Sequence, residues 1–289
     1  MEGLVPIEID PKSFFRKNCS LPALPSALTK IQKGLNSDKV STNDIVEVVK
    51  SDPSLVAHVL KIANSVYYSL PREVEDVRFA VAFLGLNEVY RIVLSISVVN
   101  TLQVKQKQAL DEFWFHSYFT ALITKMLAKR YDKLLSTEDL WSAAILHDIG
   151  KLIYLKFFPE HYKTLSSYCK DNGCLFSQAE KHFQLPASSY IGELLSVHWG
   201  LPNNIMNACK NHSMDDLDNL DNNKPISSLI RIICLGNMLA ILSHNKLSEN
   251  TKRQLIKTAM DSMKWTESDF LEIMGDVYEL KIEVEKFNA

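Results

Sequence analysis

The chain has 289 residues, of which 46% are hydrophobic and 23% are charged, and its formal net charge is −2. This length supports one large domain or two modest ones with a sizeable core, and the composition is that of a globular protein. A charge this close to neutrality gives no electrostatic argument for nucleic acid as a main partner, because a surface that neutralises a phosphate backbone carries an excess of Lys and Arg. We therefore expect no nucleic-acid partner.

The cysteines and the apolar segments bear on the compartment. Five cysteines at irregular spacing form no CxxC motif, which favours free thiols in a reducing cytosol over a disulfide framework or a zinc ribbon. Residues 1–17 carry acids and no apolar core, unlike a signal peptide. The most apolar stretch, residues 89–102, contains polar side chains and is shorter than the roughly 20 residues that span a bilayer. We expect a cytoplasmic protein with no membrane partner.

Apolar spacing and capping signals predict only helices. Ser41 with Asp44 forms the pattern of a capping box, and Asp52 before Pro53 is a strong helix start. A polar bridge at residues 105–108 is the best internal boundary. The predicted helices cover residues 27–35, 43–50, 53–66, 77–84, 86–101, 110–130, 137–147 and 226–243, and a helical segment covers residues 248–286. The segment 215–224, rich in Asp and Asn, is predicted to be an exposed loop.

The most informative segment is AILHDIGK, residues 144–151, in which His147 and Asp148 follow an apolar helix. An imidazole and a carboxylate placed side by side can bind one divalent ion together, and Lys151 follows within reach of an anionic substrate. His116 shares helical spacing with Phe119, so we expect it to point inward.

An ordered series of segments carries a family resemblance. The series is LPALP at 21–25, SDPSL at 51–55, LKIANS at 60–65, FWFHS at 113–117, the His-Asp pair, and HWGLP at 198–202. It resembles the HDOD family (HD-related output domain) of bacterial signalling proteins over roughly residues 20–240. The resemblance implies an all-α fold in which an N-terminal helical bundle packs on an HD-like helical core. It also implies a regulatory role, often without hydrolase activity.

The same resemblance implies a division of the chain. We expect an N-terminal extension at residues 1–20 and an N-terminal helical subdomain at residues 21–104. The HD-like core would follow at residues 110–244, and a C-terminal helical tail at residues 248–289 would pack on that core.

The general HD pattern supplies an early His, the His-Asp pair and a later Asp. His116, His147 and Asp148 match the first three positions. At the fourth, where the family pattern reads Leu-Ala-Asp, this chain reads LGN and ends in Asn237. An amide oxygen offers a lone pair without the negative charge, so Asn237 is a degenerate metal ligand. Losing only an outer partner of a metal site typically costs about 10–100-fold in affinity or activity, and loss of a direct carboxylate ligand should cost at least as much.

A second metal ion is not expected. Where binuclear relatives commonly carry a His four residues before the Gly at position 192, this chain has Ser188. Where relatives often carry a His-His pair, it has Asn211 and His212. The cofactor prediction is therefore none, or a single divalent ion among Mn, Fe, Ni and Zn.

Structural roles compete with metal binding for these residues. His147 and Asp148 could form a structural pair in which the carboxylate fixes the imidazole tautomer. Lys151 could be a solvated lysine or a phosphate contact.

Two functions follow. The first is a non-catalytic or degenerate signalling module that acts through association with signalling proteins, or through a small-molecule or nucleotide ligand in a remnant HD pocket. The alternative is a mononuclear metal-dependent phosphohydrolase for a nucleotide or phosphate ester. In that case His116, His147 and Asp148 would be ligands, and Lys151 would neutralise developing charge. The sequence gives no signal for an oligomeric state.

Overall fold

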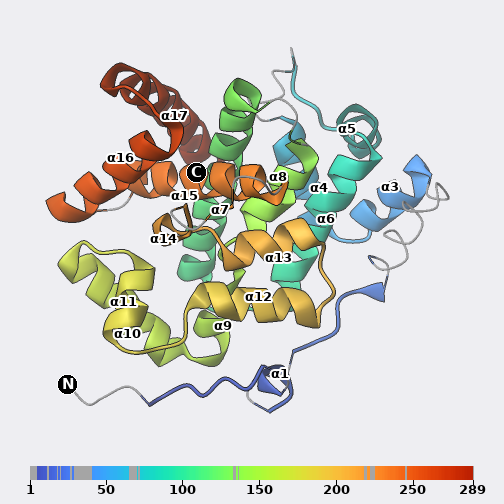
Figure 1. Cartoon of the computed structure of the whole chain (residues 1–289). Coiled ribbons are helices and arrows are strands. Elements are labelled where there is room, and N and C mark those ends of the chain that lie inside the picture. The colour runs from blue at the N-terminus through green and yellow to red at the C-terminus, as the bar shows by residue number, and fades with distance from the viewer. Residues whose placement is uncertain are drawn as a thin grey trace. The chain divides into compact units, whose positions relative to one another are not determined.

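We describe a computed structural model of the chain. It describes residues 5–11, 13–17, 19, 21–26, 28, 41–64, 70, 72–132, 135, 137–217, 220–221, 225–244 and 246–288. Every regular element in these ranges is an α-helix (Figure 1). The predicted all-α fold class is therefore confirmed. The helix predicted at residues 27–35 lies almost entirely outside the described residues.

The chain divides into two compact units. Unit 1 comprises Met1–Leu21 and Val104–Val284, and unit 2 comprises Pro22–Gln103 and Glu285–Ala289. The described helices of unit 2 are α3 (Thr42–Lys50), α4 (Pro53–Ala63), α5 (Val77–Leu84) and α6 (Leu86–Thr101).

Local capping explains where the helices of unit 2 begin. The capping box of Ser41 and Asp44 is present at α3, and the Asp52 side chain accepts the Ser54 amide at 2.8 Å before α4. Both predictions are confirmed. Gly85 has φ +86°, which L-residues rarely adopt, and here α5 and α6 meet at a bend of 113°.

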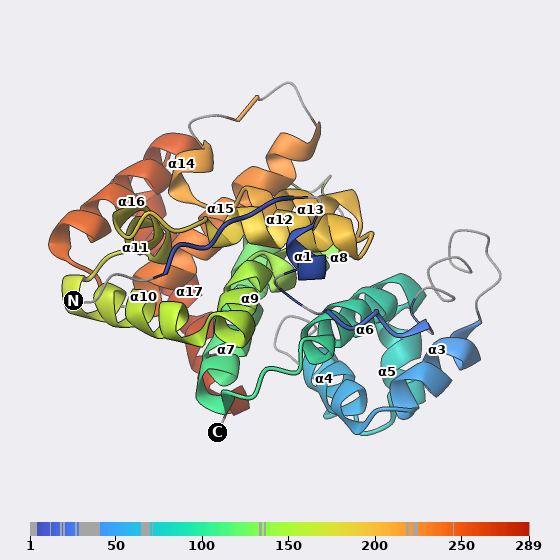
Figure 2. The same cartoon turned by 90° about the horizontal axis from the view of Figure 1, so that it is seen from below.

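Unit 1 holds the remaining helices, except that the end of the last helix, from Glu285 on, is assigned to unit 2. They are α1 (Phe14–Lys17), α7 (Lys107–Tyr131), α8 (Thr137–Leu146), α9 (Ile149–Phe157), α10 (Pro159–Asn172), α11 (Phe176–His182), α12 (Ser188–His198), α13 (Asn203–Lys210), α14 (Met214–Leu217), α15 (Pro225–His244), α16 (Glu249–Met263) and α17 (Glu267–Asn288). α12 and α13 lie side by side in both views (Figures 1 and 2).

The core of unit 1 is built on α7, which packs against both α8 and α15. Gly236 of α15 is needed for this contact, because a Cβ there would lie 2.3 Å from the Thr124 Oγ1 atom of α7. Among the described helices, α15 is long and apolar enough to cross a membrane, but 72% of that apolar stretch is buried inside the structure. α5 and α6 pass the same test only if they are counted as one span across their bend.

Two predictions at the C-terminal side of unit 1 need correction. The segment predicted as a loop at residues 215–224 begins inside a short helix, α14, because Asp216 accepts both the amide and the hydroxyl of Ser213 at 2.8 and 2.6 Å. The helical segment predicted at 248–286 is two helices, α16 and α17. The break falls at Lys264, which has a left-handed φ of 55°.

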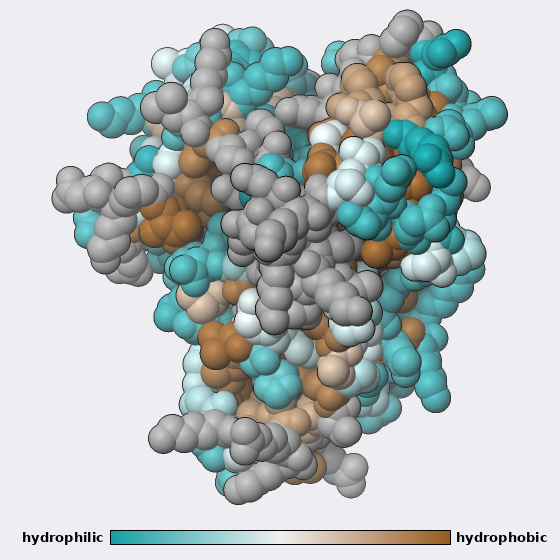
Figure 3. Space-filling view, turned by 90° about the vertical axis from the view of Figure 1, so that its right-hand side faces the viewer, coloured by the Kyte–Doolittle hydropathy of each residue, from teal (hydrophilic) through white to brown (hydrophobic). Residues whose placement is uncertain are grey.

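The surface drawn in Figure 3 mixes hydrophobic and hydrophilic residues, and its described part shows brown areas separated by teal ones. Large exposed hydrophobic side chains in the described chain include Phe79 and Phe83 of α5, whose rings stack at 6.3 Å.

Candidate metal centre

The His-Asp pair forms the turn between α8 and α9. Both side chains are buried, with 1% of His147 and 2% of Asp148 exposed. The next residue but one, Gly150, must lack a side chain, because a Cβ there would lie 1.9 Å from the Ser188 carbonyl oxygen. This close approach packs the start of α9 against α12, and it fixes the turn that carries the pair.

The imidazole of His147 has a defined tautomer. Its Nδ1 atom lies 2.6 Å from the Ala144 carbonyl oxygen, which can only accept, so Nδ1 carries the proton. In the neutral ring Nε2 is therefore a lone pair. It lies 3.4 Å from Asp148 Oδ2 and has no hydrogen-bond partner among the described residues. The expectation that Asp148 fixes this tautomer is wrong, since the Ala144 carbonyl does so and leaves Nε2 available to a ligand.

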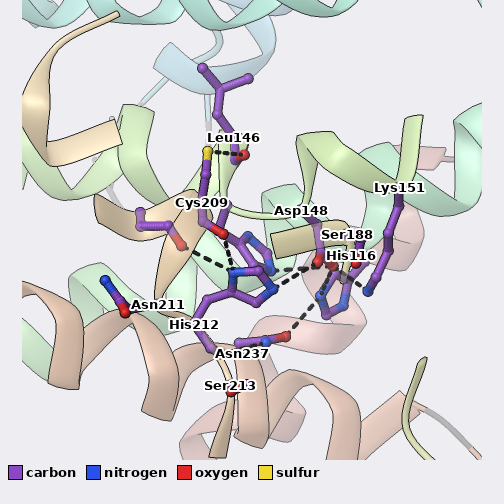
Figure 4. Close-up of polar contacts among 12 residues, drawn as sticks. His116, Leu146, Asp148, Lys151, Ser188, Cys209, Asn211, His212, Ser213 and Asn237 are labelled. Carbon is purple, nitrogen blue, oxygen red and sulfur yellow. Dashed lines mark hydrogen bonds and ion pairs between the residues drawn. The ribbon is translucent and has the colours of Figure 1, made fainter. Parts of the chain in front are cut away.

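His116 reaches the pair from α7, and Asn237 reaches it from α15 (Figure 4). The Asn237 Nδ2 group donates to the His212 carbonyl oxygen at 2.9 Å, which turns Oδ1 toward His116. His116 Nε2 lies 3.0 Å from this Oδ1 and 3.4 Å from Asp148 Oδ2. Burial lowers the pKa of His116 to about 4, so the ring is neutral at physiological pH.

His212 completes the centre, although it was not among the predicted ligands. Its Nδ1 lies 3.0 Å from the carbonyl oxygens of Ala208 and Cys209, at the end of α13, and its Nε2 lies 3.2 Å from Asp148 Oδ1. Burial lowers the pKa of His212, but the contact with Asp148 more than offsets this and leaves that pKa raised. The sequence did mark the position, because one His of the family's His-His pair is retained here.

Lys151 is paired within the protein rather than simply solvated, and its contact with a phosphate stays a prediction. Its Nζ atom lies 2.6 Å from Asp148 Oδ2, and its side chain is 25% exposed. Burial raises the pKa of the Asp148 carboxyl. Lys151 and His147 lower that pKa by more than burial raises it, so it lies well below the usual range. Asp148 is therefore an anion, and Lys151 is its internal counter-ion.

The donor atoms of this cluster fit a divalent metal ion. One ligand atom from each of His116, His147 and Asp148 lies within 4.8 Å of the others. Bonds of about 2.1 Å place neighbouring ligand atoms about 3.4 Å apart on a tetrahedral ion and about 3.0 Å apart on an octahedral one. The separations of 3.4, 3.4 and 3.0 Å given above fall on these values. Two buried atoms, His147 Nε2 and Asp148 Oδ1, also lack a hydrogen-bond partner.

A cavity of about 650 Å³ opens beside the cluster, and His116, Asp148 and Lys151 lie in its lining. Its remaining lining residues include the rings of Phe113, Tyr162 and Phe176, the exposed amines of Lys170 and Lys246, and the thiols of Cys169 and Cys174. The combination of apolar rings and cations suits a ligand with a flat ring and a negative charge.

Glu180 is a second buried carboxyl near the centre, and it was also missed in the sequence. Only 2% of this residue is exposed, and Oε1 accepts the Ser188 amide at 2.8 Å. Burial raises the pKa of Glu180 to about 7. No sequence signal distinguishes it from the many surface glutamates.

The HDOD domain pattern matches residues 21–214 of this chain. The chain belongs to the HDOD family. Three solved structures share the fold. An HDOD domain protein of Geobacter sulfurreducens has a TM-score of 0.73 and 21% identity, and the match covers 95% of this chain and 96% of that one. A protein of Shewanella amazonensis provisionally named a phosphohydrolase has a TM-score of 0.69 and 24% identity, with 96% and 98% of the two chains covered. A Marinobacter aquaeolei protein provisionally named for signal transduction has a TM-score of 0.69 and 21% identity, with 93% of this chain and 59% of that one covered.

One further relative was found by sequence. An uncharacterized protein of Treponema pallidum is 24% identical over 192 residues, which are 66% of this HDOD chain. The match spans only 37% of that relative's length. At these identities the solved structures show the fold alone, so the chemistry has to be argued from the site.

Proposed function

We propose that this HDOD protein is a regulatory module that binds one divalent ion and a phosphate-bearing ligand in its HD pocket, and that turns over little or no substrate. A signalling partner protein would then recognise the ligand-bound form. The observation that carries the proposal is the 3.0 Å contact between His116 Nε2 and Asn237 Oδ1, where the family pattern places a carboxylate.

Metal binding is supported by the donor set. His147 presents a lone pair and Asp148 presents a negative charge in a buried place. The Ala144 carbonyl oxygen orients the His147 ring, and the Lys151 amine pairs with Asp148. A bound divalent ion would act as a Lewis acid on a phosphoryl oxygen. With Asn237 in place of Asp, the protein provides one negative charge to the ion rather than two, so we expect weak binding.

Weak turnover follows from the hydrogen bonds of His116 and Asn237. The amide Oδ1 accepts, so the N–H of His116 points at Asn237 and its lone pair is not on Nε2 in the metal-free protein. Lys151 also occupies Asp148 Oδ2. Both contacts must rearrange before all donors can bind an ion, and this rearrangement opposes efficient catalysis.

The cavity supports the ligand class. A phosphate group placed near Asp148 and His116 would have the amine of Lys151 within the same lining, and the rings of Phe113 and Phe176 offer packing for an apolar or aromatic remainder. A nucleotide has both parts. The exposed amines at Lys170 and Lys246 add positive charge to the cavity lining.

One specific observation supports the hydrolase alternative. His147 Nε2 and Asp148 Oδ1 are buried, and among the described residues each has only an imidazole or carboxylate of the cluster near it, at 3.4 and 3.2 Å, as in a site whose donors serve a functional ion rather than the fold. If the ion binds strongly, the same residues would support hydrolysis of a phosphate ester.

Elemental analysis after incubation with manganese, iron, nickel or zinc tests metal binding. We expect about one equivalent in the wild type, none in His147→Ala, and one equivalent in the matched control His182→Ala. The control removes an exposed imidazole that stacks on Tyr168 outside the cluster. An absence of metal in the wild type under every condition would overturn the proposal.

Asn237→Asp separates the regulatory and catalytic readings. We expect at least a 10-fold gain in metal affinity, since the direct ligand becomes charged, together with measurable hydrolysis of p-nitrophenyl phosphate. Without metal, the variant should unfold at a lower denaturant concentration than the wild type. Asp lacks the N–H that donates to the His212 carbonyl oxygen, and it adds a buried charge. Efficient hydrolysis by the wild type, with no gain in the variant, would instead establish the enzyme.

A further inference from the structure

Two cysteines meet at the C-terminal end of α10. The helix ends at Gly173, which has a left-handed φ of 58°, and the Gly173 amide donates to the Cys169 carbonyl oxygen. The next amide, that of Cys174, reaches the same carbonyl oxygen at 3.3 Å. The Cys174 bond is the long-range bond of a Schellman-type helix end, and the Gly173 bond is that of the simpler left-handed cap.

This motif brings the side chains of those two positions into contact. In most proteins the contact is hydrophobic, but here both positions are cysteine, and each thiol influences the pKa of the other. A disulfide requires Cα atoms about 4.4–6.8 Å apart. A backbone hydrogen bond between the two residues is compatible with that separation.

The turn is held in place by the start of α16. The Gly173 carbonyl oxygen accepts the Ser248 amide and the Thr251 hydroxyl, each at 2.9 Å. A Cβ at Gly173 would lie 2.3 Å from the Ser248 nitrogen, so no other residue fits there. The two thiols are therefore presented from a fixed turn.

The pair is also reachable by small molecules. Both cysteines are partly exposed, and both lie in the lining of the 650 Å³ cavity. The other three cysteines, Cys19, Cys209 and Cys234, are buried with 1% or less of their surface exposed. The chain therefore has a single accessible pair of adjacent thiols among its described residues.

We propose that Cys169 and Cys174 are a reversible dithiol–disulfide modification site in the wall of the HD pocket, oxidised by a low-molecular-weight disulfide such as oxidised glutathione. One thiol, as its thiolate, attacks a sulfur of glutathione disulfide and releases one reduced glutathione. The second thiol then attacks the mixed disulfide, forms the bond between the two cysteines and releases the second glutathione. Two protein thiols are oxidised and one glutathione disulfide is reduced to two thiols. The site does not depend on metal binding.

The environment sets the rate of this reaction. Burial raises the pKa of the Cys174 thiol and raises that of Cys169 to about 12, so the reactive thiolate is scarce near neutral pH. The oxidation should therefore be slow at pH 7 and accelerate with rising pH up to pH 9, roughly tenfold per pH unit, because the thiolate fraction grows by that factor below the pKa.

The test is incubation of the full chain with excess glutathione disulfide, followed by alkylation, intact mass measurement and a peptide map. We expect the wild type to lose two hydrogen atoms, to show one peptide that joins Cys169 to Cys174, and to recover fully in dithiothreitol. Cys174→Ser should instead gain one glutathione at Cys169. Cys209→Ser, a buried control, should behave like the wild type.

Other outcomes overturn the inference. One is a wild type that keeps five alkylatable thiols at pH 9. Another is a disulfide that joins other cysteines, or one that forms equally well in Cys174→Ser. If Cys174→Ser does not fold, as judged by its circular dichroism, Cys174→Ala and Cys169→Ala give the same reading, since each removes one partner.

Discussion

Two carboxyl groups of unit 1 are equally buried and yet differ in charge. Asp148 and Glu180 are each 2% exposed. Asp148 has the Lys151 amine at 2.6 Å and three imidazole nitrogens between 3.2 and 3.4 Å, whereas Glu180 receives the Ser188 amide at 2.8 Å. The pKa of Asp148 lies well below its usual range, and that of Glu180 rises to about 7.

The comparison teaches that burial alone does not decide the charge of a carboxyl group. Burial raises both pKa values, and only at Asp148 do the charge of Lys151 and the contacts with neighbouring imidazoles reverse the effect. A carboxyl group must be deprotonated to bind a metal ion, so Asp148 is suited to that role and Glu180 is not. The groups that keep Asp148 ionised also compete with a metal for its oxygens.

The largest expected effect is that of Asp148→Asn. It leaves the charge of Lys151 and the raised-pKa imidazole of His212 without their partner. Removing one member of a buried pair typically costs 3–5 kcal/mol, and since Lys151 is a quarter exposed we expect about 3 kcal/mol. Urea unfolding of metal-free protein measures this loss. In a separate measurement after incubation with metal, the variant should contain no bound metal.

The double variant Asp148→Asn/Lys151→Met is the control for that prediction. Removing the orphaned amine should recover part of the lost stability, because the remaining side chains are then neutral at this contact. Exposed ion pairs contribute up to about 1 kcal/mol to stability. If Asp148→Asn lost less stability than that, the ion pair would be effectively solvated.

The sequence predicts much of this fold, because the signals involved are local. The capping residues Ser41 and Asp52 act within four residues of their helix starts, and helical periodicity marks the apolar faces. The break at Lys264 was missed because it depends on a left-handed residue that is not glycine. The helix α14 was missed because Asp216 caps it inside an otherwise polar segment.

The site was predictable only as far as its motif extends. His116, His147 and Asp148 come together as expected, since the His-Asp turn has a recognisable sequence. The contact that identifies His212 as a neighbour of Asp148 joins residues 64 positions apart in the chain, and no periodicity encodes it. The role of Lys151 as counter-ion likewise depends on how deeply the turn is buried.

Glu180→Gln sharpens the comparison through pH. The pKa of Glu180 in the folded protein, about 7, lies above the ordinary glutamate value of 4.5, so the folded state binds the proton more tightly than the unfolded state. The stability from this group is fully present below pH 4.5 and is lost as pH rises through 7, by up to about 3 kcal/mol. Glutamine does not titrate, so the variant should lack this decline.

Urea unfolding at pH 5 and pH 8 measures the difference between wild type and Glu180→Gln. Glutamine keeps an oxygen for the Ser188 amide, which makes the variant a close match in hydrogen bonding. If the two proteins lose stability in parallel between these pH values, Glu180 titrates normally and the contrast with Asp148 does not hold.

The smallest expected effect is that of Lys151→Met. Methionine keeps a long apolar side chain in the cavity lining but removes the amine that occupies Asp148 Oδ2. A metal ion would no longer have to displace this counter-ion, so we expect its affinity to rise about 10-fold, or about 1.4 kcal/mol. Competition of zinc with a chromophoric chelator measures this gain. Lys163→Met removes an exposed amine from α10 and serves as the matched control. An equal gain in both variants would assign the effect to net charge, and a loss in Lys151→Met would mean that the lysine supports the ion instead of competing with it.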